Sequence, residues 1–340
     1  MEFTWTTVLP LIFLAVMGLS LLAYVVLDGY DLGVGILLPF ATDAEKDVMV
    51  SSIGPFWDAN ETWLVLGIGV LLTAFPKAHS LVLTHLYLPV AVMLVGLILR
   101  GVSFDFRVKA HAARKGMWNA LFSTGSLMAA MAQGWMLGSY LTGFDNSSPW
   151  SLAFAASIAL TLPTAYAMLG AGWLIMKTWD DLQLKAVGWA RKVLLPMGLT
   201  LVGISLATPL VSHTVFERWF AMPQLIGLLP IPVACAAAFF AAWKVITKPK
   251  IVAAGYGWVV FACTVLIFVM AFLGLAYSLF PYIVIDQLTV WQAASAHESL
   301  VVIFIGVAIT LPAIVVYTIF MYRVFWGRAS ELSYAGNAPH

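Results

Sequence analysis

Seven long stretches of the chain contain no Asp, Glu, Lys or Arg, and this repeated pattern limits the fold more than any other feature. Each stretch is long enough to cross the hydrocarbon core of a bilayer, which takes about 20 helical residues. Only 10% of the residues are charged, against about 25% in soluble domains. The sequence therefore predicts an all-α polytopic membrane protein, with spans at Phe3–Leu27, Gly116–Phe144, Asn146–Met176, Val193–Phe216, Trp219–Trp243, Ile251–Ile285 and Ser299–Tyr322.

Two further spans are expected between the first and second of these stretches. Ala78–Leu99 contains no Asp, Glu, Lys or Arg, and His79 and His85 are the histidines within it. Thr62–Pro76 is also free of charge but is too short to cross a bilayer. To span, this second segment must begin near Gly54 and take Asp58 and Glu61 inside. We therefore expect nine transmembrane helices.

The basic residues test this count, because cytoplasmic loops of membrane proteins carry an excess of Lys and Arg. With nine spans, Lys77 and Arg218 lie on the side of the amino terminus, and the other 15 of the 17 basic residues lie on the opposite side. We therefore expect the N-terminus to be periplasmic and the C-terminus cytoplasmic. No loop is long enough for a soluble domain, and no basic domain favours nucleic acid. Residues 1–340 are expected to form a single integral membrane domain.

Six ionisable residues at the predicted inner ends of the first three spans are the main candidates for function. A charged side chain at membrane depth costs about 2.5–3.5 kcal/mol on insertion scales, so it is a functional hypothesis by default. Four of the six form two carboxylate pairs, each spaced three residues apart and so on one helical face. The six are Asp28, Asp31, Asp58, Glu61, Arg100 and Asp105.

These residues allow two interpretations. A neighbouring carboxylate raises the pKa of an acidic side chain, and a neighbouring guanidinium lowers it. A group that contains both can therefore be poised to exchange protons. The structural alternative is that Asp28 and Arg100 are interfacial caps or form an ion pair between helices. For Asp58 the short span favours function, because it is expected to draw the carboxylate into a dry, protein-lined environment.

Histidine placement bears on haem binding. His85 is the only histidine well inside a predicted span, and one histidine cannot supply the paired ligands of a b-type haem. We expect His85 to be a core residue, and we expect this chain alone to bind no haem and no metal.

Three sequence blocks carry a resemblance to a known family. LDGYDLGVGILLPF begins at Leu27, GPFWDANETWLVLG begins at Gly54, and LRGVSFDFR begins at Leu99. Together with YTIFMYRVFWGR near the carboxyl terminus, they are similar to signature blocks of subunit II of the cytochrome bd quinol oxidases. The short, lysine-poor loops look most like the cyanide-insensitive branch of that family.

The resemblance implies a fold, an activity and partners. It implies two four-helix bundles plus one peripheral helix, in a bacterial inner-membrane complex that oxidises quinol and reduces O2 to water. Two b-type haems and one d-type haem, and the quinol site, are expected in the partner, subunit I. A small single-helix subunit and a structurally bound quinone are further expectations, and membrane lipid surrounds the complex.

The resemblance also gives the candidate residues a role. The acidic residue of its second block belongs to a proton path from the cytoplasm toward the haems, and here it is Asp58. Asp28, Asp31, Arg100 and Asp105 match neighbouring positions of the family, and Glu61 lies one helical turn after Asp58. Two alternatives stay open at this point: a stand-alone proton-coupled membrane transporter, and a purely structural subunit that only packs against its partner.

Overall fold

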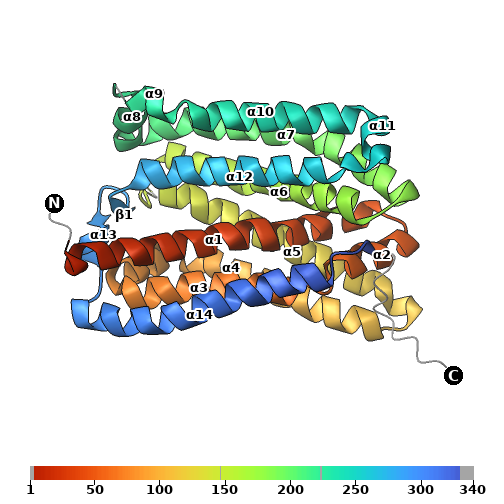
Figure 1. Cartoon of the computed structure of the whole chain (residues 1–340), viewed down its shortest axis with the longest axis horizontal. Coiled ribbons are helices and arrows are strands. Elements are labelled where there is room, and N and C mark those ends of the chain that lie inside the picture. The colour runs from red at the N-terminus through yellow and green to blue at the C-terminus, as the bar shows by residue number, and fades with distance from the viewer. Residues whose placement is uncertain (1–3, 146, 223, 330–340) are drawn as a thin grey trace.

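The computed structural model describes residues 4–145, 147–222 and 224–329. Its long helices lie roughly along one direction, side by side (Figure 1). They are α1 (Trp5–Leu37), α3 (Trp57–Ala74), α4 (Pro76–Lys109), α5 (Ala112–Leu141), α6 (Pro149–Lys177), α7 (Asp180–Val211), α10 (Pro230–Thr247), α12 (Trp258–Leu279) and α14 (His297–Val324). Seven of them, all except α3 and α5, are long and apolar enough to cross a membrane. The all-α polytopic class is thereby confirmed.

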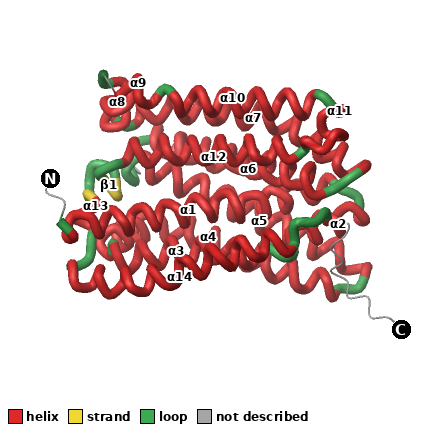
Figure 2. The backbone as a smooth tube through the Cα atoms, viewed as in Figure 1, coloured by secondary structure: helices red, strands yellow, loops and turns green. Residues whose placement is uncertain are grey.

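Short elements close the two ends of the molecule. At the end where α1 begins lie α8 (His213–Phe220), α9 (Gln224–Leu228), α13 (Val290–Ala293) and a small hairpin of β1 (Tyr282–Val284) and β2 (Leu288–Thr289). The hairpin is the only strand structure among the described residues (Figure 2). At the opposite end lie α2 (Asp43–Ile53) and α11 (Pro249–Ile251), and α14 also ends there. The described part of the chain thus begins and finishes at opposite ends of the helical layers.

Two predicted helix boundaries near the acidic residues were wrong. The second span was expected to begin near Gly54, but α3 begins at Trp57, after the separate helix α2. The third span was expected to end at Leu99, but α4 continues to Lys109. The helix α4 continues past these charges because Arg100 and Arg107 turn inward, where they pair with Asp28 and Asp47. Charge-free length alone therefore underestimates a helix that buries paired charges.

Close contact between α1 and α6 fixes the centre of the fold. A Cβ atom on Gly33 would lie 1.8 Å from the carbonyl oxygen of Tyr166, and one on Gly170 would lie 2.4 Å from the carbonyl carbon of Gly33. The two backbones therefore touch without intervening side chains, as small residues permit between membrane helices. This contact holds the buried second half of α1, which carries Asp28 and Asp31, within the core.

Candidate functional site

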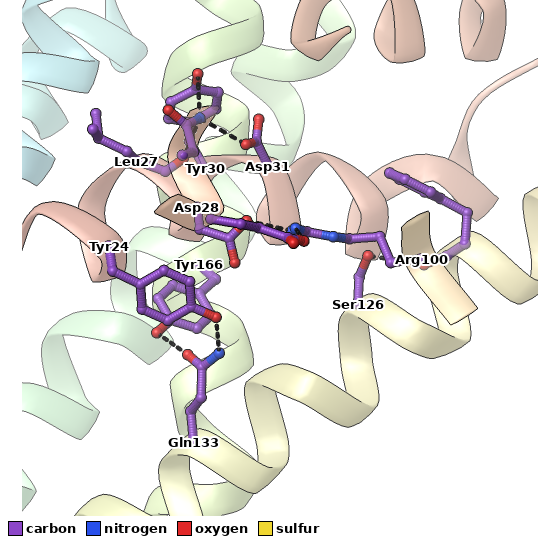
Figure 3. A network of polar contacts seen from close by, with 12 residues as sticks. Tyr24, Leu27, Asp28, Tyr30, Asp31, Arg100, Ser126, Gln133 and Tyr166 are labelled. Carbon is purple, nitrogen blue, oxygen red and sulfur yellow. Dashed lines mark hydrogen bonds and ion pairs between the residues drawn. The ribbon is translucent and has the colours of Figure 1, made fainter. Parts of the chain in front are cut away.

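Arg100 of α4 is the centre of a buried charged cluster. Its Nη1 donates a hydrogen bond to Oδ1 of Asp28 on α1 at 2.5 Å, and its Nη2 donates to Oε1 of Glu61 on α3. The side chains of Arg100 and Asp28 are 1% and 0% exposed, whereas that of Glu61 is 29% exposed. One guanidinium therefore joins a carboxylate that reaches the surface of the chain to one that is fully enclosed. Figure 3 shows Arg100 extending toward Asp28.

Asp31 takes part in a second, neighbouring network. Its Oδ2 accepts a hydrogen bond from Nδ2 of Asn60 at 2.8 Å, and the same amide lies 3.0 Å from the hydroxyl of Tyr30. Tyr322 of α14 closes this hydrogen-bond network. Its hydroxyl lies 2.6 Å from that of Tyr30 and donates to Oδ1 of Asn60 at 3.1 Å. Asn60 escaped the sequence reasoning because it carries no charge, although it stands between two of the predicted acidic residues.

A third polar group lies beside Asp28 (Figure 3). Gln133 of α5 donates through Nε2 to the hydroxyl of Tyr24 at 2.9 Å and accepts at Oε1 from the hydroxyl of Tyr166 at 2.5 Å. Both tyrosines are close enough to Asp28 for electrostatic interaction. A search restricted to charged residues cannot find this group, because its members are neutral and stand in apolar runs.

The structure does not bring Asp58 and Asp105 into the cluster. Both residues are exposed at the surface of the chain, and neither forms an ion pair within the described ranges. The expectation that Asp58 is drawn into a dry environment is wrong for this chain by itself. The reason is helical phase, since Ala59, Asn60 and Trp63 take the buried positions of α3 and Asp58, in its first turn, lies on the other face.

Three buried polar atoms of the cluster have no hydrogen-bond partner among the described residues. They are Oδ2 of Asp28, Oδ1 of Asp31 and Nε of Arg100. Burying such groups is costly unless they are paired. Two carboxylates contact the single guanidinium and that of Asp31 lies in the neighbouring network, so acidic groups outnumber basic ones at this place.

Two further clusters were not predicted from the sequence. Arg107 donates to Oδ1 of Asp47 at 2.6 Å and to Oδ1 of Asn119 at 2.5 Å, which links α2, α4 and α5. Lys177, at the end of α6, is buried and donates to three consecutive carbonyl oxygens, each at 2.9 Å. Those carbonyls belong to residues 325–327, which follow α14. No spacing rule connects these residues, because their partners come from distant parts of the chain.

His85 was expected to be a core residue, and this was wrong. Its side chain is exposed on α4, and its ring stacks on Phe144 with the centroids 5.0 Å apart. The next residue, Leu86, occupies the inward position. An exposed ring that is already stacked on an aromatic side chain does not resemble an axial haem ligand held between two helices.

The fold and the site together define the class of protein, and the comparisons then define the family. The chain is a polytopic helical membrane protein in which a buried arginine joins two carboxylates among α1, α3 and α4. Within that class it belongs to the family of cytochrome bd terminal oxidase subunit II, whose family model matches residues 9–325. This result confirms the family suggested by the sequence blocks.

Individual relatives agree with this assignment. The chain is 28% identical to "Cytochrome bd ubiquinol oxidase subunit 2" of Bacillus subtilis, over 90% of this chain and 92% of the relative. It is 26% identical to "Cytochrome bd-I ubiquinol oxidase subunit 2" of Escherichia coli, over 95% and 96%. A chain of the bd oxidase from Geobacillus thermodenitrificans has the same fold, with a TM-score of 0.72 at 18% identity, over 94% of this chain and 98% of that one.

Family membership settles the broad function. The chain is a subunit of an oxidoreductase complex, a terminal oxidase of the respiratory chain, and a multi-pass protein of the bacterial inner membrane. The complex contains haem, and a subunit II implies a subunit I as partner. The relatives are oxidase subunits, so the comparisons favour the oxidase over the stand-alone transporter.

Proposed function

We propose that this chain, together with a haem-bearing subunit I, forms a quinol:O2 oxidoreductase that reduces O2 to water. Two b-type haems and one d-type haem, and the site of quinol oxidation, belong to subunit I in this proposal. Relatives named as ubiquinol oxidase subunits support the substrate class. A small single-helix subunit and a structurally bound quinone complete the proposed complex.

We further propose nine membrane spans in two four-helix bundles, with α14 peripheral. In support, α3 and α5 are helices that pack beside the seven apolar ones, and α14 buries only Leu300 among its residues. The amino terminus is proposed to be periplasmic, because that arrangement puts most basic residues in the cytoplasm. A reporter fused after His340, which lies outside the described residues, is expected to be active only in a form that works in the cytoplasm.

The proposed role of this subunit is to supply part of a proton-uptake path from the cytoplasm. Asp58 is exposed, Glu61 is half-buried one turn later, and Asp28 is enclosed. Arg100 contacts the last two together, and this double contact is the observation that carries the proposal. Protons are proposed to pass among these carboxylates, with Asp31 beside them and Asp105 at the cytoplasmic end. Because Asp58 is exposed on this chain, we propose that it faces subunit I.

Substitution of Asp58 tests this path. Asp58→Asn keeps the shape of the side chain but cannot exchange protons. The variant complex is expected to assemble with its haem absorption intact and to lose most of its quinol oxidase turnover. Asp58→Glu retains the titratable group and is expected to keep much more activity. Turnover at the wild-type rate in the fully assembled Asn variant would remove Asp58 from the path and leave Glu61 or Asp28 as the entry.

A control separates proton transfer from assembly. Asp180 is also an exposed acidic residue at the start of a helix, but it belongs to α7, far along the chain from the cluster. Asp180→Asn is expected to leave both haem content and turnover unchanged. Loss of haem in Asp58→Asn alone would support the purely structural alternative.

A further inference from the structure

A pocket of about 480 Å³ opens at the hairpin between α4 and α5, outside the charged cluster. It lies at the end of the molecule opposite the start of α1 (Figure 1). The side chains around it are basic, aromatic or apolar: Phe106, Lys109, His111, Arg114, Met117 and Trp118. No acidic side chain lines it. The pocket is therefore suited to an anion that also carries apolar groups.

The positive charge of this pocket is not neutralised within the described part of the chain. Lys109 and Arg114 form no ion pair there, whereas nearby Arg107 and Lys115 both pair with Asp47. Asp105, one turn before Lys109 on α4, is exposed, does not line the pocket and makes no ion pair with Lys109 among the described residues. Two cations beside a pocket without a counter-charge favour a negatively charged ligand.

The walls of the pocket continue into an apolar surface. Phe106 stacks on Trp118 with the ring centroids 5.3 Å apart. Phe106 is also the last member of an exposed row on α4, formed by Val95, Ile98 and Val102 at helical spacing. This row leads along the helix directly to Lys109. A ligand that fits both parts has a long apolar tail and an anionic head.

We propose that this pocket binds the phosphate of an anionic glycerophospholipid, whose acyl chains lie along the exposed row of α4. Lys109 and Arg114 hold the phosphate, and the ring pair of Phe106 and Trp118 packs against the glycerol region. Basic pockets at helix ends on the cytoplasmic side attract anionic lipid headgroups in this way. Aromatic side chains are typical of the level at which headgroups meet hydrocarbon.

Photolabelling of the intact oxidase complex tests the proposal. The complex is reconstituted into phosphatidylcholine vesicles with a trace of photoactivatable phosphatidylglycerol, and labelled peptides are identified by mass spectrometry. Labelling of the segment 106–118 is expected with this lipid and not with photoactivatable phosphatidylcholine. The double variant Lys109→Gln/Arg114→Gln is expected to lower it about 25-fold, at about fivefold for each basic residue.

The matched control is Lys248→Gln/Lys250→Gln, which removes two exposed cations at the same end of the molecule. It is expected to leave the labelling unchanged, and all variants are expected to keep their haem absorption. Equal labelling by both lipids would overturn the proposal. So would displacement of the label by inorganic phosphate, which would identify a free-anion site, and so would absence of labelling in the complex, which would show that a partner subunit covers the pocket.

Discussion

Arg100 places Nη1 2.5 Å from Oδ1 of Asp28, and the chain encloses both side chains completely. The two residues are 72 positions apart in the sequence and come from different helices. A buried ion pair adds little net stability over a well-packed apolar pair, but removal of one partner leaves an uncompensated charge. The pair therefore makes α1 and α4 dependent on each other.

Arg100→Gln is expected to destabilise the subunit strongly. It removes the only cation that contacts Asp28 and Glu61 among the described residues, and breaking a buried pair costs about 3–5 kcal/mol. Thermal unfolding and haem retention of the purified complex measure the effect. Arg323→Gln, at an exposed position of α14, is the control and is expected to behave as wild type. Normal haem retention in Arg100→Gln would show that the carboxylates do not need this partner.

Gly33→Ala is expected to separate α1 from α6. The new methyl group would overlap the carbonyl oxygen of Tyr166, and forcing extra atoms into a packed core costs about 1–3 kcal/mol or more. The control is Gly203→Ala on α7, where a methyl group meets nothing within 4 Å. A lower unfolding temperature is expected for the first variant only, and equal temperatures for the two would contradict the backbone contact.

Lys177→Met is expected to release the segment that follows α14. The variant keeps an apolar stem of similar length but loses three hydrogen bonds to the carbonyls of residues 325–327. Limited trypsin digestion of the complex reports the change, because Arg323 and Arg328 flank that segment. Faster cleavage is expected at both sites, and Lys177→Arg is expected to slow it again. The control is Lys192→Met on α7, in which trypsin is expected to cleave at Arg323 and Arg328 at the wild-type rate.

His85→Ala is expected to leave the haem spectrum of the complex unchanged. The ring is exposed and stacked on Phe144, and we place the haems in subunit I. Absorption spectra of the reduced and oxidised complex provide the measurement. Disappearance of one haem band while the subunits stay together would show that this residue is a ligand.

The sequence predicted the class of fold because an apolar run of span length has few alternatives to a membrane helix. It also placed Asp28, Glu61 and Arg100 near one depth and offered an ion pair between Asp28 and Arg100 as one of two interpretations, because charge at membrane depth needs a partner. Helix starts and rotations were less predictable. Whether Asp58 faces in or out depends on the rotation of α3 about its axis, and the buried positions of Ala59, Asn60 and Trp63 leave it on the surface.

Neutral polar residues were beyond sequence reasoning of this kind. Asn60, Gln133 and Tyr166 have no charge to mark them, and their hydrogen bonds connect helices that are distant along the chain. Lys177 was visible as a basic residue but looked like an ordinary cytoplasmic charge. Its burial depends on carbonyls that follow α14, some 150 residues later.

The Arg100–Asp28 pair also constrains how the protein is made. Synthesis proceeds from the amino terminus, so α1 leaves the ribosome with its two aspartates before the codon for Arg100 has been translated. Until α4 arrives, those carboxylates must stay protonated, remain hydrated or be shielded by the insertion machinery, because lone charges in hydrocarbon are costly. The helix α1 therefore reaches its final environment only after α4 has entered the membrane. Until then, the first segments to be synthesised must be kept close together.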